Sequence, residues 1–331
     1  MNRTAAVVAT GRYLPERRVT NDELRRHFAG HDPDDIIDRF EASSGIQQRF
    51  WAAPEEITSD LALAAARQTL ERAGRRADQV DLIILGTDTP DQITPATSVV
   101  LQRKLGARNA GTFDIGCACA SFPTALATAA GLLATNSGLR SILVVGAYLM
   151  HRLADPDDPM VFFYGDGAGA ALLEPATDRG ICASAFLADG RYADHWGILA
   201  GGTREPASHA AVAANRTRVQ LQQRYPPALN EAGWPRLIGQ LERNGGFRAD
   251  GISAAIFTQV NANSILAACR ASAIPADRAP RLMDRYGYTG SACVPIVLDH
   301  LLTANAIGPG DLITLIGSGV GYNMAGVAMR L

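Results

Sequence analysis

The chain has 331 residues, of which 47% are hydrophobic and 19% charged, and its formal net charge is −2. This length and composition allow a large buried core and exclude a disordered chain. The small, evenly spread charge argues against a nucleic-acid surface. No apolar run long enough to cross a bilayer stands out, the N-terminus lacks a signal-peptide pattern, and five scattered cysteines do not form a disulfide framework. The sequence therefore predicts a soluble cytoplasmic protein.

Strand and helix patterns alternate along the first half of the chain. Apolar runs bounded by glycine, proline or polar residues predict strands at 5–9, 80–86, 112–115 and 141–146. Helical spacing of apolar and small residues predicts helices at 58–73, 96–105 and about 119–135. The alternation predicts a parallel or mixed sheet covered by helices.

The second half resembles a repeat of the first. A strand at 252–257 and a helix from about 262 parallel the segment 80–105, and residues 164–174 resemble 317–331, each read as a glycine hairpin leading into an apolar strand. We therefore expect two pseudo-duplicated halves, 1–175 and 176–331. The polar segment 203–245 is expected to form a surface excursion.

The segment FDIGCACASFPTA, residues 113–125, carries the first chemical signal. A strand followed by small residues and a helix places Cys119 at a strand-to-helix turn. The free N–H groups and positive end of a helix stabilise a thiolate and can also hold an oxyanion. A thiolate there suits reversible acyl transfer. The alternatives are that Cys117 and Cys119 are buried small hydrophobes, or, less consistent with the sparse histidines, that they bind metal.

The order of motifs resembles a known family across nearly the whole chain. DIGCACASF, ILVVG, YGDGAGAALL, DRYGYTGSACVP and a glycine-rich C-terminal hairpin are similar to the type III ketoacyl carrier-protein synthases of the thiolase superfamily. The resemblance implies an α/β fold of five layers, αβαβα, and a homodimer that uses Cys, His and Asn. It places the nucleophile at Cys119, with Cys117 packed inside, and a second oxyanion amide at Gly319 and Val320.

Two catalytic positions depart from the family pattern. The motif H-Q-A-N corresponds here to VNAN, so Val260 stands at the histidine, and Tyr288 stands where the family has asparagine. In the family these two donors stabilise the enolate formed when malonyl thioester loses carbon dioxide. Losing one such donor typically costs about 2.7–4 kcal/mol of transition-state stabilisation. The sequence therefore predicts acyl transfer without decarboxylation.

Such a transfer still needs a base. His195 lies in the loop where family members cover their substrate tunnel, and we expect it to replace the lost histidine, oriented by Asp194; the alternative is an ordinary surface histidine. Asn263 survives from the family motif and is expected to orient the donor, or simply to cap the following helix. Tyr288 keeps one hydroxyl for positioning.

The resemblance also bears on substrate and partner. At the family's coenzyme A positions this chain has Arg39, Ser43 and Pro159, which favours a donor on the phosphopantetheine arm of an acyl carrier protein over acyl-CoA. Thr94 stands where the partner subunit closes the acyl pocket, often with phenylalanine, so we expect a larger acyl group than acetyl. No cofactor and no metal are expected.

Three functions remain open at this point. The first is an acyltransferase of polyketide, antibiotic or fatty-acid-type metabolism, and the second is a priming ketosynthase that condenses by an altered mechanism. The third is a catalytically silent partner that binds carrier protein. The remaining cysteines, Cys182, Cys269 and Cys293, lie in apolar segments and are expected to pack in the core.

Overall fold

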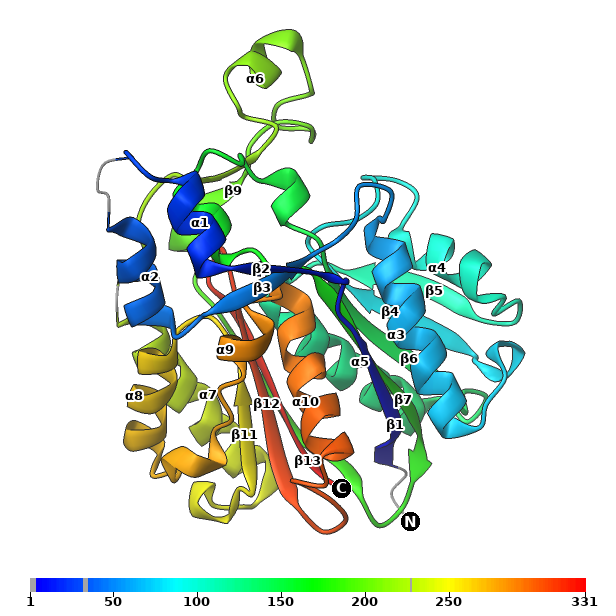
Figure 1. Ribbon diagram of the computed structural model, residues 1–331. Coiled ribbons are helices and arrows are strands. Elements are labelled where there is room, and N and C mark those ends of the chain that lie inside the picture. Colours follow the sequence, from blue (N-terminus) through cyan, green and yellow to red (C-terminus); the bar gives the residue numbers. More distant parts are fainter. Residues whose placement is uncertain (1–3, 32–34, 227) are drawn as a thin grey trace.

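Two sheets organise the protein in the computed structural model, which describes residues 4–31, 35–226 and 228–331 (Figure 1). The first sheet has the order β1-β7-β6-β4-β5, and the second has the order β11-β12-β13-β8. Their bounds are β1 Thr4–Tyr13, β4 Leu82–Gly86, β5 Gly111–Ile115, β6 Ile142–Tyr148, β7 Gly167–Ala176, β8 Gly180–Ala188, β11 Ala254–Phe257, β12 Leu312–Gly319 and β13 Asn323–Arg330. Both sheets are mixed: β4 pairs parallel to β5 and β6, and β11 parallel to β12, whereas the other pairs are antiparallel.

Three helical layers sandwich these sheets. Helices α5 (Ser121–Thr135) and α10 (Cys293–Thr303) lie between the sheets and contact both. Helices α3 (Thr58–Ala73) and α4 (Thr97–Leu105) cover the outer face of the first sheet, and α7 (Leu229–Gly245), backed by α8 (Ala262–Ser272), covers the second. The expected five-layered αβαβα fold is confirmed.

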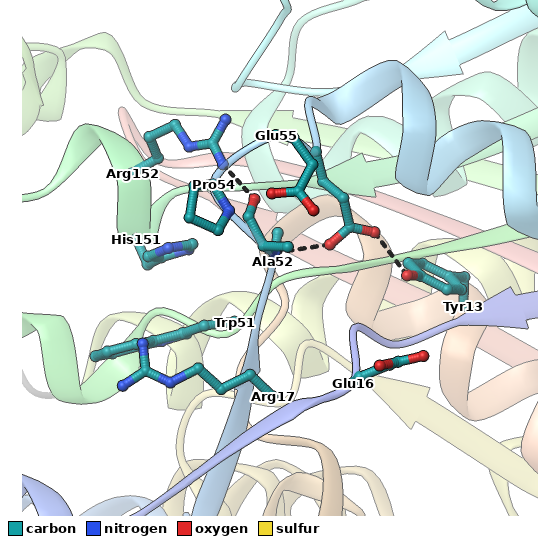
Figure 2. A pocket seen from close by; sticks show the side chains of 11 residues that line it. Tyr13, Glu16, Arg17, Trp51, Ala52, Pro54, Glu55, His151 and Arg152 are labelled. Atoms are coloured by element: carbon teal, nitrogen blue, oxygen red, sulfur yellow. Dashed lines mark hydrogen bonds between the residues drawn. The ribbon is translucent and has the colours of Figure 1, made fainter.

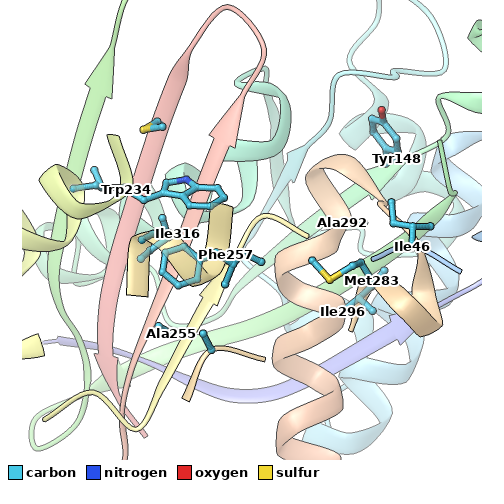
Figure 3. Packing of buried hydrophobic residues seen from close by; sticks show 14 of the residues in the cluster. Ile46, Tyr148, Trp234, Ala255, Phe257, Met283, Ala292, Ile296 and Ile316 are labelled. Carbon is cyan, nitrogen blue, oxygen red and sulfur yellow. The ribbon is translucent and has the colours of Figure 1, made fainter. Parts of the chain in front are cut away.

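The buried side chains explain why the middle layer is thin. Helix α5 faces the sheets with small and medium residues such as Ala125, Leu126 and Ala129, all fully buried, so both sheets approach it closely. Larger side chains fill the space behind the second sheet, where the Trp234 and Phe257 rings lie 5.0 Å apart (Figure 3). The cluster around α5 is therefore distinct from the cluster behind the second sheet.

Shorter elements complete the chain. These are β2 Arg17–Thr20, β3 Gln48–Trp51, β9 Trp196–Ile198, β10 Val219–Leu221, α1 Asn21–His27, α2 Ile36–Ser44, α6 His209–Ala213 and α9 Met283–Tyr286. Strands β2 and β3 pair, as do β9 and β10. The α6 segment projects from the rest of the protein as a small lobe (Figure 1).

Most predicted elements are present, but several expectations are wrong. The helix α7 belongs to the outer layer, because Trp234, Leu237 and Leu241 bury against the second sheet, so 203–245 is only partly an excursion. The segment before β7 follows a 3-10 helix at Pro159–Phe163 rather than forming a hairpin. Cys182 is exposed, because it lies on the edge strand β8 with its side chain on the open face.

An apolar helical stretch at Ala118–Thr135 does reach 18 residues, contrary to the sequence expectation. Its residues lie between the two sheets, and 56% of the stretch is buried inside the protein. Length and apolar composition here reflect a central core helix. The chain passes from the first sheet to the second between Ala176 and Gly180, and the division into halves 1–175 and 176–331 stays a prediction.

Candidate active site

Cys119 occupies a strained turn between β5 and α5. The turn is a short 3-10 helix, Ala118–Ala120, and Ala118 has a left-handed φ of 47°, which is unfavourable for a residue with a Cβ. The Ala120 N–H donates to the Cys117 carbonyl at 3.0 Å, and the Cys117 N–H donates to Ser121 Oγ at 2.9 Å. Cys119 is 2% exposed. These bonds fix the backbone on both sides of the buried thiol.

The end of β12 lies directly against this turn. A Cβ on Gly319 would lie 2.4 Å from the Cys117 carbonyl oxygen and 3.2 Å from the Cys119 nitrogen. A Cβ on Gly317 would lie 2.6 Å from the Cys119 carbonyl oxygen. Only glycine permits this approach. It brings Gly319, with Val320 in the turn that follows, beside the Cys119 amide, as an oxyanion hole requires.

Tyr288 reaches the same thiol from the segment before α10. Its hydroxyl is in hydrogen-bonding contact with Cys119 Sγ. The backbone there is held by a bridge to Tyr164 and by the Gly165 N–H, which donates to the Tyr288 carbonyl at 2.9 Å. Gly287 and Gly290, with φ values of 72° and 47°, give the chain the turns that place this ring.

Burial dominates the electrostatics of the site. It raises the pKa of Cys119 well above the usual thiol value, Asp88 and Cys293 raise it further, and the Tyr288 hydrogen bond lowers it. Burial, followed by the neighbouring Cys119, likewise raises the pKa of Tyr288. The expected stabilisation of a thiolate by the helix end is thus outweighed, because desolvation disfavours the charged form. Burial therefore favours the neutral thiol form of Cys119.

Comparison with known proteins gives the context for this geometry. The family model "3-Oxoacyl-[acyl-carrier-protein (ACP)] synthase III" matches residues 113–190, and its C-terminal counterpart matches 241–331. A beta-ketoacyl-[acyl-carrier-protein] synthase III of Rhodopirellula baltica is 36% identical over 335 residues, which cover 95% of each chain. The chain belongs to the 3-oxoacyl-[acyl-carrier-protein] synthase III family. It is therefore an enzyme of a transferase family, as the resemblance implied.

Further members of the synthase III family agree over the full length. The Thioalkalivibrio sulfidiphilus enzyme of the same name is 32% identical, with 98% of this chain and 99% of the relative covered. The crystal structure of the priming beta-ketosynthase from the R1128 polyketide pathway matches with a TM-score of 0.89 at 29% identity, covering 100% of this chain and 97% of that one. FabH of Pseudomonas aeruginosa matches with a TM-score of 0.87 at 26% identity, over 99% and 98%.

Two residues of the VNAN segment, residues 260–263, differ in their exposure to solvent. Val260 is partly buried in the turn after β11, beside Gln259, whose backbone contacts the Cys293 thiol. Asn263 is exposed in the first turn of α8, and its Nδ2 reaches the Ser43 carbonyl only at 3.5 Å. The N-cap of α8 is Asn261, which accepts from the Ser264 N–H, so the capping alternative for Asn263 is wrong.

His195 belongs to an aromatic group that also contains Tyr192 and Tyr225. Its ring packs against Tyr192 and Tyr225, with centroids 5.0 and 5.2 Å away. Tyr225 accepts a hydrogen bond from the Gly321 N–H at 3.0 Å. Burial, and after it the charge of Cys119, raises the pKa of Tyr225. Asp194, the expected orienting group, is highly exposed and accepts a 2.7 Å bond from Arg204.

The residues expected to meet the donor lie together near α2. Arg39 and Ser43 are on α2, which packs against both α8 and the 3-10 helix that begins with Pro159. Thr94 lies in an exposed loop, next to Ile93, whose side chain is 76% exposed. Among the described residues, no group of three or more His, Cys, Asp or Glu side chains is placed to hold a metal ion.

A separate cavity of about 730 Å³ lies on the other side of Trp51 (Figure 2). His151 stacks on one face of the Trp51 indole at 5.2 Å, and the Arg17 guanidinium lies 5.1 Å from the ring centroid. His151 Nδ1 is paired with the fully buried Asp166, which also accepts from the Ala52 N–H at 2.8 Å. This pair fixes the position of His151, which lines the cavity.

Sequence reasoning missed Asp88, which follows the end of β4. Polar residues just beyond the carboxyl ends of parallel strands commonly line α/β sites, and the segment GTDT after the strand 82–86 carried that signal.

Proposed function

We propose that the protein is an acyltransferase, which loads an acyl group onto Cys119 and passes it to an alcohol, amine or thiol without decarboxylative condensation. The observation that carries this proposal is the contact between the Tyr288 hydroxyl and Cys119 Sγ. At this position the family has the asparagine that stabilises an enolate.

Decarboxylation needs hydrogen-bond donors around the thioester oxygen of the malonyl group. Val260 offers no side-chain donor, and the Tyr288 hydroxyl is already engaged with the nucleophile. Loading needs only the thiol and an oxyanion hole, for which the Cys119 amide lies beside Gly319. The site thus keeps the groups needed for loading and lacks free donors for the enolate, which favours acyl transfer over condensation.

For the onward step we propose His195 as the base that takes the acceptor's proton, acting beside Tyr225, with Asp194 and Asn263 as supporting residues. The donor is an acyl carrier protein or coenzyme A thioester, whose phosphopantetheine arm belongs to the substrate and not to a resident cofactor. We further propose that the protein is a homodimer in the cytoplasm, with Thr94 beside the partner's acyl pocket. Its role would lie in polyketide or antibiotic metabolism.

The second candidate is a priming ketosynthase. It is favoured by full-length similarity to proteins named as synthases III and to the R1128 priming beta-ketosynthase. Condensation would then require Tyr288, Asn263 or His195 to stabilise the enolate in place of the family's histidine and asparagine.

Intact-protein mass spectrometry separates the candidates. Wild type, Cys119→Ala and His195→Ala are incubated with acyl-CoA and acyl-carrier-protein thioesters, with and without malonyl thioester. An adduct lost only in Cys119→Ala, without carbon dioxide release, supports the transferase. An adduct with carbon dioxide release supports the ketosynthase, and no adduct with any donor leaves a silent carrier-protein-binding partner.

A further inference from the structure

A single peptide group joins the side chain of Trp51 to the backbone of Tyr288. The indole Nε1–H of Trp51 donates to the Tyr164 carbonyl oxygen at 2.7 Å. The N–H of the same peptide group belongs to Gly165 and donates to the Tyr288 carbonyl oxygen at 2.9 Å. Tyr164 and Tyr288 also form an isolated parallel bridge. Because a peptide group is planar, the bond that fixes its carbonyl on one edge also directs its N–H on the other edge.

The indole of Trp51 is itself held in place. The His151 ring stacks on it with an interplanar angle of 6°, and the Arg17 guanidinium lies 5.1 Å from the ring centroid (Figure 2). His151 Nδ1 is paired with Asp166, and Asp166 accepts from the N–H of Ala52, the residue that follows the tryptophan, at 2.8 Å. Contacts on the ring and on the backbone beside it therefore fix the direction of the indole N–H.

The backbone on either side of Tyr288 is tightly packed. A Cβ on Gly165 would lie 3.2 Å from the Tyr288 carbonyl oxygen and 3.1 Å from the Cβ of the fully buried Arg49. A Cβ on Gly287 would lie 2.8 Å from the same Arg49 atom. A displacement of the 164–165 peptide group is therefore passed on to Tyr288, because packed segments transmit strain. The hydroxyl of Tyr288 is the group in contact with Cys119 Sγ.

We propose that Trp51 is a positioning residue for Cys119. Its indole N–H holds the 164–165 peptide group, and this peptide group holds Tyr288 where its hydroxyl meets the thiol. Trp51 thus acts on the reactivity of Cys119 only through Tyr288. The inference rests on the proposed function only in taking Cys119 as the reacting group, and it holds equally for acyl transfer and for condensation.

The test is a double-mutant cycle read by alkylation of Cys119 with iodoacetamide at pH 8, followed at that residue by tandem mass spectrometry. Trp51→Phe keeps an aromatic ring for the stack and removes the N–H donor. We expect Trp51→Phe to slow alkylation about threefold or more, as for the loss of one hydrogen bond between neutral groups. In the Tyr288→Phe background the same substitution should change nothing further. A wild-type rate in Trp51→Phe, or a loss that persists without the Tyr288 hydroxyl, would overturn the proposal.

Two control variants separate positioning from general stability. Trp196→Phe is the matched control, because the Trp196 indole donates to the side-chain hydroxyl of Tyr164, at 3.3 Å, and not to its carbonyl. His151→Phe removes a partner of buried Asp166 but leaves the Trp51 N–H in place. We expect the alkylation rate of wild type in both, with a lower thermal unfolding temperature in His151→Phe. Slowing in either control equal to that in Trp51→Phe would sink the proposal.

A second form of the test serves if Trp51→Phe does not fold. A benzothiophene analogue of tryptophan at position 51 keeps the bicyclic ring and lacks only the N–H, and we expect the same threefold slowing from it; an unchanged alkylation rate would overturn the proposal. Iodoacetamide requires no acyl donor. Failure of any thioester to load Cys119, or release of carbon dioxide from malonyl thioester, would therefore count only against the proposed function.

Discussion

The hydroxyl of Tyr288 lies against the Sγ atom of Cys119, the residue that we propose as the nucleophile. The contact lowers the pKa of Cys119 and raises that of Tyr288, as expected if the hydroxyl donates to a thiolate. A hydroxyl in this position can donate to the sulfur when Cys119 reacts. The predictions below follow from this contact and from the groups that surround it.

Tyr288→Phe should make Cys119 less reactive. Hydrogen bonds to charged groups are worth about 1.5–3 kcal/mol, so the thiolate population should fall by about tenfold or more. The rate of iodoacetamide alkylation against pH measures this change. Tyr286→Phe is the control, because its hydroxyl bonds to His300 Nδ1 at 2.8 Å; equal alkylation rates in wild type and Tyr288→Phe would contradict the prediction.

The double variant Val260→His/Tyr288→Asn should gain decarboxylation of malonyl thioester. Each restored donor is worth about 2.7–4 kcal/mol at the developing oxyanion, and both are needed for a large effect. The measurement is carbon dioxide release, compared between wild type, the two single variants and the double variant. Wild-type release as fast as that of the double variant would refute the proposed loss of condensation.

Gly319→Ala should abolish loading or prevent folding. The added Cβ would lie 2.4 Å from the Cys117 carbonyl oxygen and would push β12 away from the Cys119 amide. Overpacking of this kind costs about 1–3 kcal/mol of stability. Gly308→Ala, where a Cβ meets nothing within 4 Å, is the matched control for both thermal unfolding and loading.

Asp88→Asn should stabilise the protein above neutral pH. The folded-state pKa of about 7 exceeds the ordinary value of 3.8 for this carboxyl group, so the folded protein holds the proton more tightly. Wild type therefore loses stability as pH rises from about 4 to 7, by at most about 4 kcal/mol, and Asn removes this loss. Unfolding free energies at pH 4.5 and 8 give the check: we expect the difference between variant and wild type to grow with pH.

His151→Phe should destabilise the protein without removing the stacking on Trp51. It leaves Asp166 buried with one partner fewer, which we expect to cost about 1–3 kcal/mol. Arg17→Ala, on the open side of the same indole (Figure 2), should cost about 0.5–1 kcal/mol at most. Denaturant unfolding gives the loss of stability in each variant. Equal small losses of stability would mean that buried Asp166 does not need His151 as a partner.

Local patterns predicted several elements well because their signals are short-ranged. Helix α3 occupies the predicted residues, 58–73, since its apolar spacing and its following Gly74 are both local. The turn at Cys119 was also readable, because small residues between a strand and a helix define it. The role of α7 was not, because only the second sheet gives its apolar face a partner.

The sequence by itself determined the layered fold and the family, because periodicity and ordered motifs are properties of neighbouring residues, and Cys119 as the nucleophile stays a prediction. Tertiary structure alone decided that Tyr288 meets Cys119 across 169 positions of chain. It also decided that the Oδ1 atom of Asp88 is buried without a hydrogen-bond partner among the described residues. Burial and long-range contact set the charge of a thiol or a carboxyl group, and neither is encoded in any single stretch of the chain.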